Sequence, residues 1–393
     1  MANTLTNLLP TIYEALDIVA RELVGFIPAV TRNSSAERVT LNQNVTFPIA
    51  PAVTLSDITP GQLPPDDGDQ TIGTSTLTIT KSKYAPVRWS GEEIRGVSNT
   101  YPTNVQPTIL RDQFTQAMRA LCNAVEVDLF SAVNGGSSRT FPITVPGSAP
   151  FATAGDLSDS AGVRRILDDN GTTQTDLHLV LGAAAMQNIR GKQSVLFKVN
   201  EAGTTELLRQ GTIGQLEGFN IHNSAAVTSF TKGTGSAYVT SGSSAAGTNS
   251  VALVTGTGTV LAGDVVTFAA DTANAYVVTS GVAAPGTITL GTPGLKTTIP
   301  TGNAMTILGN HTPNFAFNRA AVQLVTRAPA MPTDLSGTPM DSADDVTEVV
   351  DPISGLAFQV AAYRLYRRIK YEVGLAWGVK VIKNDFVATL LGA

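Results

Sequence analysis

The densest basic group of the 393-residue sequence lies near its C-terminal end and contains Arg364, Arg367, Arg368 and Lys370. Guanidinium and ammonium groups bind phosphate and carboxylate groups. In an extended strand, alternate positions would place Arg364, Arg368 and Lys370 on one face. The cluster could contact nucleic acid or acidic groups of another copy of the chain, and a solvated or salt-bridged strand face is an equally good interpretation.

The residue types that most often bind metals are few and scattered. The histidines His178, His222 and His311 lie in different predicted elements, and none has a second histidine or a glutamate at metal-binding spacing. The single cysteine, Cys122, lies in a predicted helix and can form neither a disulfide nor a cysteine-based metal site. We interpret all four as structural or exposed side chains and expect no metal and no cofactor.

Adjacent carboxylates are the remaining candidates for acid–base chemistry, and they occur as Asp66-Asp67, Glu92-Glu93, Asp168-Asp169 and Asp344-Asp345. Neighbouring side chains point in different directions on a helix or a strand, which disfavours a catalytic pair. The sequence also lacks a nucleophile elbow, a phosphate-binding loop, a dinucleotide-binding motif and an HExxH motif. We therefore predict that the chain is not an enzyme.

Composition excludes further classes of protein. Charged residues make up 15% of the chain, hydrophobic residues 42%, and the formal net charge is −5. A protein that grips nucleic acid through many phosphate contacts normally carries a basic excess, which this chain lacks. Neither a signal-peptide pattern nor a run of about 18 apolar residues is present, so we expect no membrane partner.

Two elements are predicted near the N-terminus. Apolar residues at helical spacing predict a helix over residues 10–24. Two strand-like runs, VTLNQNVTFPIAP and TSTLTITKSKYAPVRW, flank the Pro-, Gly- and Asp-rich residues 60–73 and predict a long two-stranded arm with a polar tip. Its second strand would present Leu77, Ile79, Lys81 and Lys83 on one face. An arm with so little apolar surface would gain stability against a neighbouring molecule, with Lys81, Lys83, Asp66 and Asp67 as candidate contacts.

The strongest local signal is an apolar stripe at helical spacing over residues 108–133, ended by Asn134-Gly135-Gly136. Shorter helices, near residues 160–168 and 183–190, alternate with the apolar strand LHLVLG and predict a mixed α/β domain. Residues 228–310 contain only four charged side chains, Lys232, Asp264, Asp271 and Lys296, and several short β-rich runs. This segment is predicted to form a separate all-β module, a small barrel or sandwich.

The order of these elements resembles the major capsid protein fold shared by tailed double-stranded-DNA phages and herpesviruses. The stretches that carry the resemblance are TIYEALDIVARELVG, TLTITKSKYAPVRWSGEEI, TILRDQFTQAMRALCNAVEVDLFSAV and DLHLVLGAAAMQNIRG with IGQLEGFNIHNSAAV. The β-rich insert, followed by NFAFNRAAVQLVTRAPAMP and VVDPISGLAFQVAAYRLYRRIKYEVGLAWGVKVI, is similar to the podophage coat subgroup with an inserted domain.

The resemblance implies an α+β fold with six segments. Residues 1–39 would form an N-terminal arm and helix, residues 40–90 an extended β-hairpin loop, and residues 91–140 a peripheral domain with its spine helix. Residues 141–227 would begin the axial domain, residues 228–312 would form the inserted all-β domain, and residues 313–393 would complete the axial and peripheral domains.

The resemblance also implies a function and partners. The chain would assemble through hexamers and pentamers into an icosahedral shell around packaged double-stranded DNA, without sequence specificity, in the cytoplasm of a bacterial host. A portal protein and a separately encoded scaffolding protein are implied partners, because the arm begins almost at Met1, and a decoration protein is a further candidate. The family's crosslinking lysine, asparagine and glutamate find no match here, so we expect a non-covalent shell.

Two other functions stay open at this point. The same fold also builds encapsulin-type cellular compartments that store cargo enzymes. The Thr-, Gly- and Ser-rich β module would alternatively suit a secreted glycan-active enzyme or adhesin, against which the missing signal peptide and carboxylate pair argue.

Overall fold

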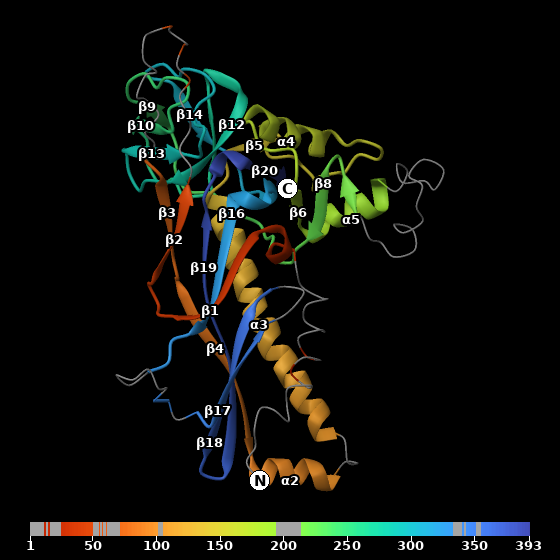
Figure 1. Cartoon of the computed structure of the whole chain (residues 1–393). Coiled ribbons are helices and arrows are strands. Elements are labelled where there is room, and N and C mark those ends of the chain that lie inside the picture. Colours follow the sequence, from red (N-terminus) through yellow and green to blue (C-terminus); the bar gives the residue numbers. More distant parts are fainter. Residues whose placement is uncertain are drawn as a thin grey trace.

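The computed structural model describes residues 12, 15, 25–49, 55, 57, 60, 71–100, 105–193, 214–332, 340, 341, 343–350 and 355–393. The body is elongated, and helix α3 (Val105–Gly135) runs along much of its length (Figure 1). A group of short strands lies at one end of the body, and helix α2 (Gly91–Thr100) lies at the other. In the part of the chain that the structure describes, no helix is long and apolar enough to cross a membrane.

Helix α3 has 31 residues and is therefore about 46 Å long. Its buried stripe follows the predicted spacing and contains Leu110, Phe114, Met118, Leu121, Val125, Leu129 and Val133. These side chains join one core with apolar residues of β4 (Lys81–Ser90) and β19 (Arg368–Val381). The helix predicted over residues 108–133 is confirmed, and it begins about one turn earlier than predicted.

A six-stranded sheet covers this helix. Its order is β1 (Thr31–Val39), β16 (Val322–Pro329), β19, β18 (Ala357–Leu365) and β17 (Asp345–Val350), and β4 pairs with the other part of β19. Trp377 of β19 is fully buried, as expected of a core anchor, whereas Trp89 is only partly buried against this core.

The basic cluster lies on a hairpin, which corrects its predicted geometry. The chain reverses direction at Tyr366 and Arg367, so that Leu365 pairs with Arg368 and Tyr363 with Lys370. Opposite residues of an antiparallel pair share a face. Arg364, which pairs with Ile369, therefore lies on the face opposite to Arg368 and Lys370, and the prediction of one shared face is wrong. The charged residues cannot be buried between the two apolar runs, so the reversal places them at the solvent-exposed end.

A second, twelve-stranded sheet combines the axial part of the molecule with the β-rich segment. Its order is β11 (Val265–Phe268), β14 (Ala304–Ile307), β9 (Tyr238–Thr240), β10 (Ser250–Val254), β13 (Thr287–Leu290), β12 (Asp271–Ser280), β5 (Arg139–Phe141), β20 (Val387–Gly392), β15 (Thr312–Asn318), β6 (Leu177–Leu181), β8 (Phe219–Asn223) and β7 (Gln215–Leu216). Helices α4 (Ser158–Asp169) and α5 (Ala183–Lys192) pack on its axial part.

Strands β9 to β14 close into a barrel, because β11 pairs with β12 as well as with β14. The barrel has its own core, which includes Tyr238, Val266, Phe268 and Ile288. The all-β module predicted for this segment is therefore confirmed and is a barrel rather than a sandwich. The complete chain has the α+β class that the sequence predicts, although one sheet runs continuously from the barrel into the axial part.

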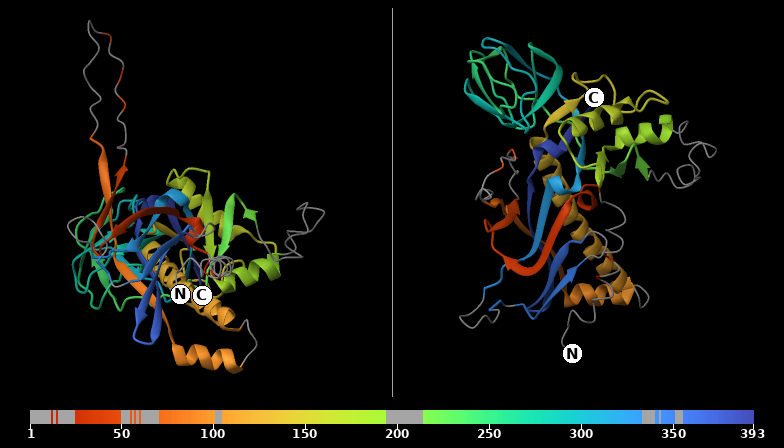
Figure 2. Two further views of the ribbon diagram at one scale, coloured as in Figure 1. Left: turned by 60° about the horizontal axis from the view of Figure 1, so that its bottom comes forward. Right: turned by 45° about the horizontal axis from the view of Figure 1, so that its top comes forward.

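Strands β2 (Asn44–Ile49) and β3 (Gly73–Thr78) form a two-stranded hairpin that projects from the body (Figure 2, left). Leu77 and Ile79 anchor its base beside Val39 and Ala376. The predicted second strand is interrupted after Thr78, and residues 81–90 belong to the large sheet instead. Nearly all of the predicted arm tip, with Asp66 and Asp67, lies outside the described residues. So does the predicted N-terminal helix except Ile12 and Ala15, which are helical and buried.

Candidate functional site

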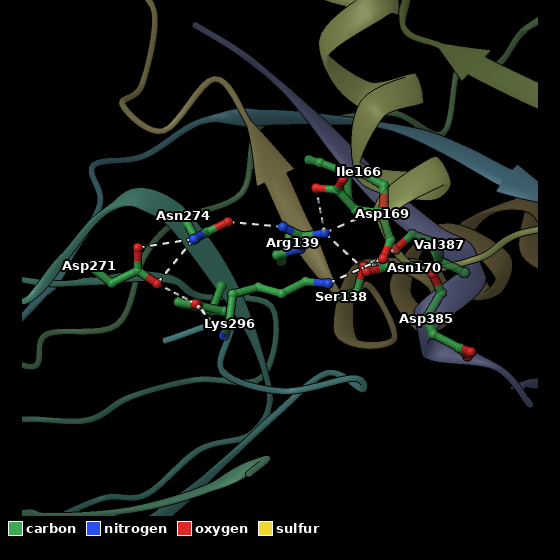
Figure 3. A network of polar contacts seen from close by, with 11 residues as sticks. Ser138, Arg139, Ile166, Asp169, Asn170, Asp271, Asn274, Lys296, Asp385 and Val387 are labelled. Carbon is green, nitrogen blue, oxygen red and sulfur yellow. Dashed lines mark hydrogen bonds and ion pairs between the residues drawn. The ribbon is translucent and has the colours of Figure 1, made fainter. Parts of the chain in front are cut away.

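A polar junction attaches the barrel to the rest of the molecule (Figure 3). Arg139 of β5 is only 3% exposed, and its strand pairs with β12 on one side and β20 on the other. Its guanidinium donates to Asn274 Oδ1 of the barrel at 2.9 Å and to Asn170 Oδ1 after α4 at 3.0 Å. It also reaches the carboxylate of Asp169 at 3.4 Å. One buried side chain thus bonds to both modules.

The partners of Arg139 are themselves held in place. Asn170 Nδ2 donates to Ser138 Oγ at 3.1 Å and to the carbonyl of Asp385 at 2.8 Å. On the barrel side, Asp271 accepts from Asn274 at 3.0 and 3.1 Å. Burial lowers the pKa of Arg139 and the nearby Asp169 carboxylate raises it, with a net lowering. Because both shells of contacts are fixed, the junction can define one orientation of the barrel.

A second buried charge, Glu126 of α3, clamps the segment that enters from the N-terminus. Its carboxylate is 3% exposed and accepts hydrogen bonds from the backbone N–H groups of Phe26 at 3.0 Å and Ile27 at 2.9 Å. Ser224, which follows β8, donates its hydroxyl at 2.7 Å. Burial raises the pKa of Glu126, and these hydrogen bonds oppose the shift. The contact joins three segments that are distant in sequence.

Arg319 holds the other end of the same segment. Its guanidinium donates to the carbonyl of Pro28 at 3.1 Å, and its own carbonyl accepts from Thr31 Oγ1 at 2.9 Å. Asp176 lies 3.5 Å from the guanidinium. A carboxylate at the start of the short helix η2 (Ile27–Ala29) and a cation at its end match the helix dipole and the unpaired backbone groups.

Two of the three histidines meet beside Arg319, although the sequence separates them by 44 positions. His178 Nδ1 lies 2.9 Å from His222 Nε2, and His178 Nε2 lies 3.0 Å from Asp176 Oδ1. Burial, the neighbouring His178 and Arg319 lower the pKa of His222 to about 4. Within the described residues no group of three histidine, cysteine, aspartate or glutamate side chains could hold a metal. The pair is therefore a structural, hydrogen-bonded contact between β6 and β8.

The other predicted site residues are divided by the structure. Lys81 belongs to β4 and forms an ion pair with Asp128 of α3, whereas Lys83 is exposed on the same strand. Lys370 forms an ion pair with Glu372, and Arg364 lies 3.2 Å from the carboxylate of Asp344. Arg367 and Arg368 are exposed at the tip of the β18–β19 hairpin. The acidic pairs are not brought together as catalytic pairs by any contact among the described residues.

The reading of the sequence missed Glu126, Arg139 and the His178–His222 contact. One of them left a signal: Glu126 lies four positions after Cys122 and three before Leu129, on the apolar stripe of the predicted helix. A carboxylate on a buried stripe requires hydrogen-bond donors from elsewhere in the fold. Arg139 and the histidines had no comparable local pattern.

Solved structures with a similar arrangement come from phages and related particles. The capsid structure of the cyanophage P-SCSP1u is 12% identical, with a TM-score of 0.47 over 93% of this chain and 86% of that chain. The capsid of Ralstonia phage GP4 is 9% identical, with a TM-score of 0.44 over 93% and 87%. A virus-like particle from Pyrococcus furiosus is 9% identical, with a TM-score of 0.42 over 97% and 98%. No protein-family model and no curated protein matches the chain.

Replacing Arg139 by alanine is expected to lower the free energy of unfolding by about 2–4 kcal/mol, because Asn170 and Asn274 lose a buried charged donor. Lys296→Ala is the matched control, since its partly exposed ammonium makes only one bond in this network, to the carbonyl of Asp169. Chemical denaturation measures both. An equal effect of the two variants would show that Arg139 does not carry the junction.

Glu126→Ala is expected to destabilise the chain by about 2–4 kcal/mol, because it leaves two buried backbone N–H groups without an acceptor. It should also expose residues 25–30 to hydrogen exchange, since their anchor is lost. Asn123→Ala, on the exposed side of the same helix, is the control. Unchanged exchange of residues 25–30 in Glu126→Ala would contradict the clamp.

The histidine pair predicts acid sensitivity of the unassembled chain. The pKa of His222 is lowered from 6.5 to about 4, so the unfolded chain binds a proton that the folded chain rejects. The contribution to stability is present above pH about 6.5 and is lost as the pH falls towards 4. Partial exposure reduces it to about 1–2 kcal/mol. His222→Gln should flatten this slope in denaturation at pH 7 and pH 4.5, and an unchanged slope would exclude His222 as the cause.

Proposed function

We propose that this chain is the major coat subunit of a tailed phage. It assembles through hexamers and pentamers into an icosahedral shell that encloses packaged double-stranded DNA. The observation that carries the proposal is the β2–β3 hairpin, which projects from the body and leaves Ile72 67% exposed and Leu41 54% exposed (Figure 2, left). Isolated two-stranded hairpins are marginally stable in water, so this arm needs a surface of another molecule.

The rest of the geometry suits a shell subunit. Helix α3 and the sheet of β4, β19 and β18 form a stiff, elongated unit, which can transmit contacts between its two ends. A closed lattice multiplies contacts between identical copies, so each single interface can stay weak enough to correct errors during growth. A net charge of −5 suits a container whose wall does not adhere strongly to DNA.

The proposal includes partners and boundaries. A separately encoded scaffolding protein and a portal protein would assist assembly in the cytoplasm of the bacterial host, and a decoration protein is a further candidate. The shell is non-covalent and the subunit is not an enzyme. The six segments expected from the sequence, with boundaries at residues 39, 90, 140, 227 and 312, belong to the same proposal.

Electron microscopy and sedimentation of the full chain, expressed alone and with the scaffolding protein of the same genome, test the proposed function. We expect shells large enough to hold a phage genome. Small shells of uniform size that contain protein cargo would favour an encapsulin-type compartment instead. A chain that stays monomeric under both conditions and hydrolyses glycans would overturn the proposal in favour of an enzyme.

Deleting residues 60–73 is expected to leave the subunit folded, because these residues lie beyond the buried base of the arm. The shell should lose stability, since the arm is shortened. The melting temperature of the unassembled chain and the survival of shells on dilution measure the two effects. Shells as stable as those of the native chain would refute the assignment of this hairpin as an intersubunit arm.

A further inference from the structure

Two of the four cations of the C-terminal cluster are not neutralised within the chain. Lys370 pairs with Glu372 and Arg364 with Asp344. Arg367 and Arg368 form no ion pair with any other residue that the structure describes, and both are exposed. Arg367 lies 5.7 Å from the ring centroid of Tyr366, a neighbour in sequence. The hairpin tip thus presents two available guanidinium groups.

These groups border an open cleft of about 1240 Å³. The cleft lies between the tip of the β18–β19 hairpin and the first turn of α2, at the same end of the body (Figure 1). The backbone N–H of Gly91 donates to the carbonyl of Arg367 at 3.1 Å, which fixes the tip against α2. The carboxylates of Glu92 and Glu93 line the opposite wall. A basic wall therefore faces an acidic wall across one cleft.

The two acidic residues differ in their use inside the chain. Glu93 accepts from the backbone N–H of Ser90 at 2.7 Å and caps α2, and its pKa is lowered mainly by its hydrogen bonds to Ser90. Glu92 is exposed and makes no printed-range ion pair with a described cation. Glu92 and Arg367 are therefore the charges of opposite sign that the cleft leaves available.

The apolar content of the tip argues for a protein partner. Tyr366 is 87% exposed and Leu365 is 50% exposed. Tyrosine and arginine are enriched in the residues that dominate the energy of protein interfaces. A phosphate backbone would meet Arg367 and Arg368, but it would also meet the carboxylates of Glu92 and Glu93 in the same cleft. Nucleic acid is therefore disfavoured at this surface.

We propose that the cleft binds the hairpin tip of a second copy of this chain, with Arg367 of one copy against Glu92 of the next. Because the basic and the acidic residue are different positions, the contact is head-to-tail rather than a symmetric pair. Each copy offers both halves, so successive contacts of this kind form a ring when the rotation closes. Leu365 and Tyr366 would be buried in each contact. The inference rests on the proposed function, for which it supplies one interface.

Charge reversal and mixing test the contact in the full-length chain. Arg367→Glu alone and Glu92→Arg alone are each expected to reduce the yield of shells about tenfold, because each places like charges together at every contact. A mixture of the two variant chains in equal amounts should recover a substantial part of the yield, since each variant then complements the other. The double variant R367E/E92R should assemble better than either single variant. Lys232→Glu, on the barrel, is the matched control and should assemble normally.

The readouts separate the possible failures. A contact within one chain would be restored in the double variant but not by mixing, and that outcome overturns the inference. Normal shells from both single variants also overturn it and leave the proposed function intact, whereas a native chain that forms no shells with its scaffolding protein contradicts the proposed function. Melting of the unassembled variants shows whether they fold. Normal empty shells that fail only to retain DNA in Arg367→Glu would indicate a nucleic-acid contact and reject a protein contact.

Discussion

The burial of one face of α3 against β4 and β19 is the contact on which the rest of the structure depends. Each fully buried large apolar side chain contributes about 1.5–3 kcal/mol, and this interface contains Phe114, Leu121 and Trp377 among many others. A polar anchor fixes the register, because Asp128 of the helix accepts from the indole N–H of Trp377 at 2.7 Å and pairs with Lys81. The helix, the hairpin tip and the base of the arm are thereby parts of one rigid body.

Charged groups are buried where segments that are distant in sequence meet. Glu126 joins the N-terminal segment to α3 and to the end of β8, and Arg139 joins the barrel to α4 and β20. A buried charge tolerates few alternative arrangements, because losing its partners costs more than the paired contact contributes. These residues therefore specify how the segments dock, while the apolar clusters supply most of the stability.

The barrel illustrates how a module can be added without disturbing the body. Its core is separate from the cluster around α3, and it joins the rest through the pairing of β12 with β5 and through the Arg139 network. The surfaces proposed for assembly, the projecting hairpin and the cleft beside α2, are formed by other elements. Changes on the outer surface of the barrel should consequently affect the subunit contacts little.

Features of short range could be read from the sequence alone. The stripe from Leu110 to Val133 determined the long helix, because helical periodicity is a property of neighbouring residues. The lack of charge between residues 228 and 310 indicated the all-β module for the same reason. The sequence also pointed to the hairpin arm and to the basic cluster as exposed features.

Contacts of long range were decided only by the tertiary structure. No local pattern can show that Glu126 meets a backbone 100 positions earlier, or that His178 meets His222 across two parallel strands. The reversal at Tyr366 and Arg367 likewise depended on both flanking strands packing against the same helix, which separated Arg364 from Arg368. The sequence determines which groups need partners, and only the packing of the whole chain decides which partners they find.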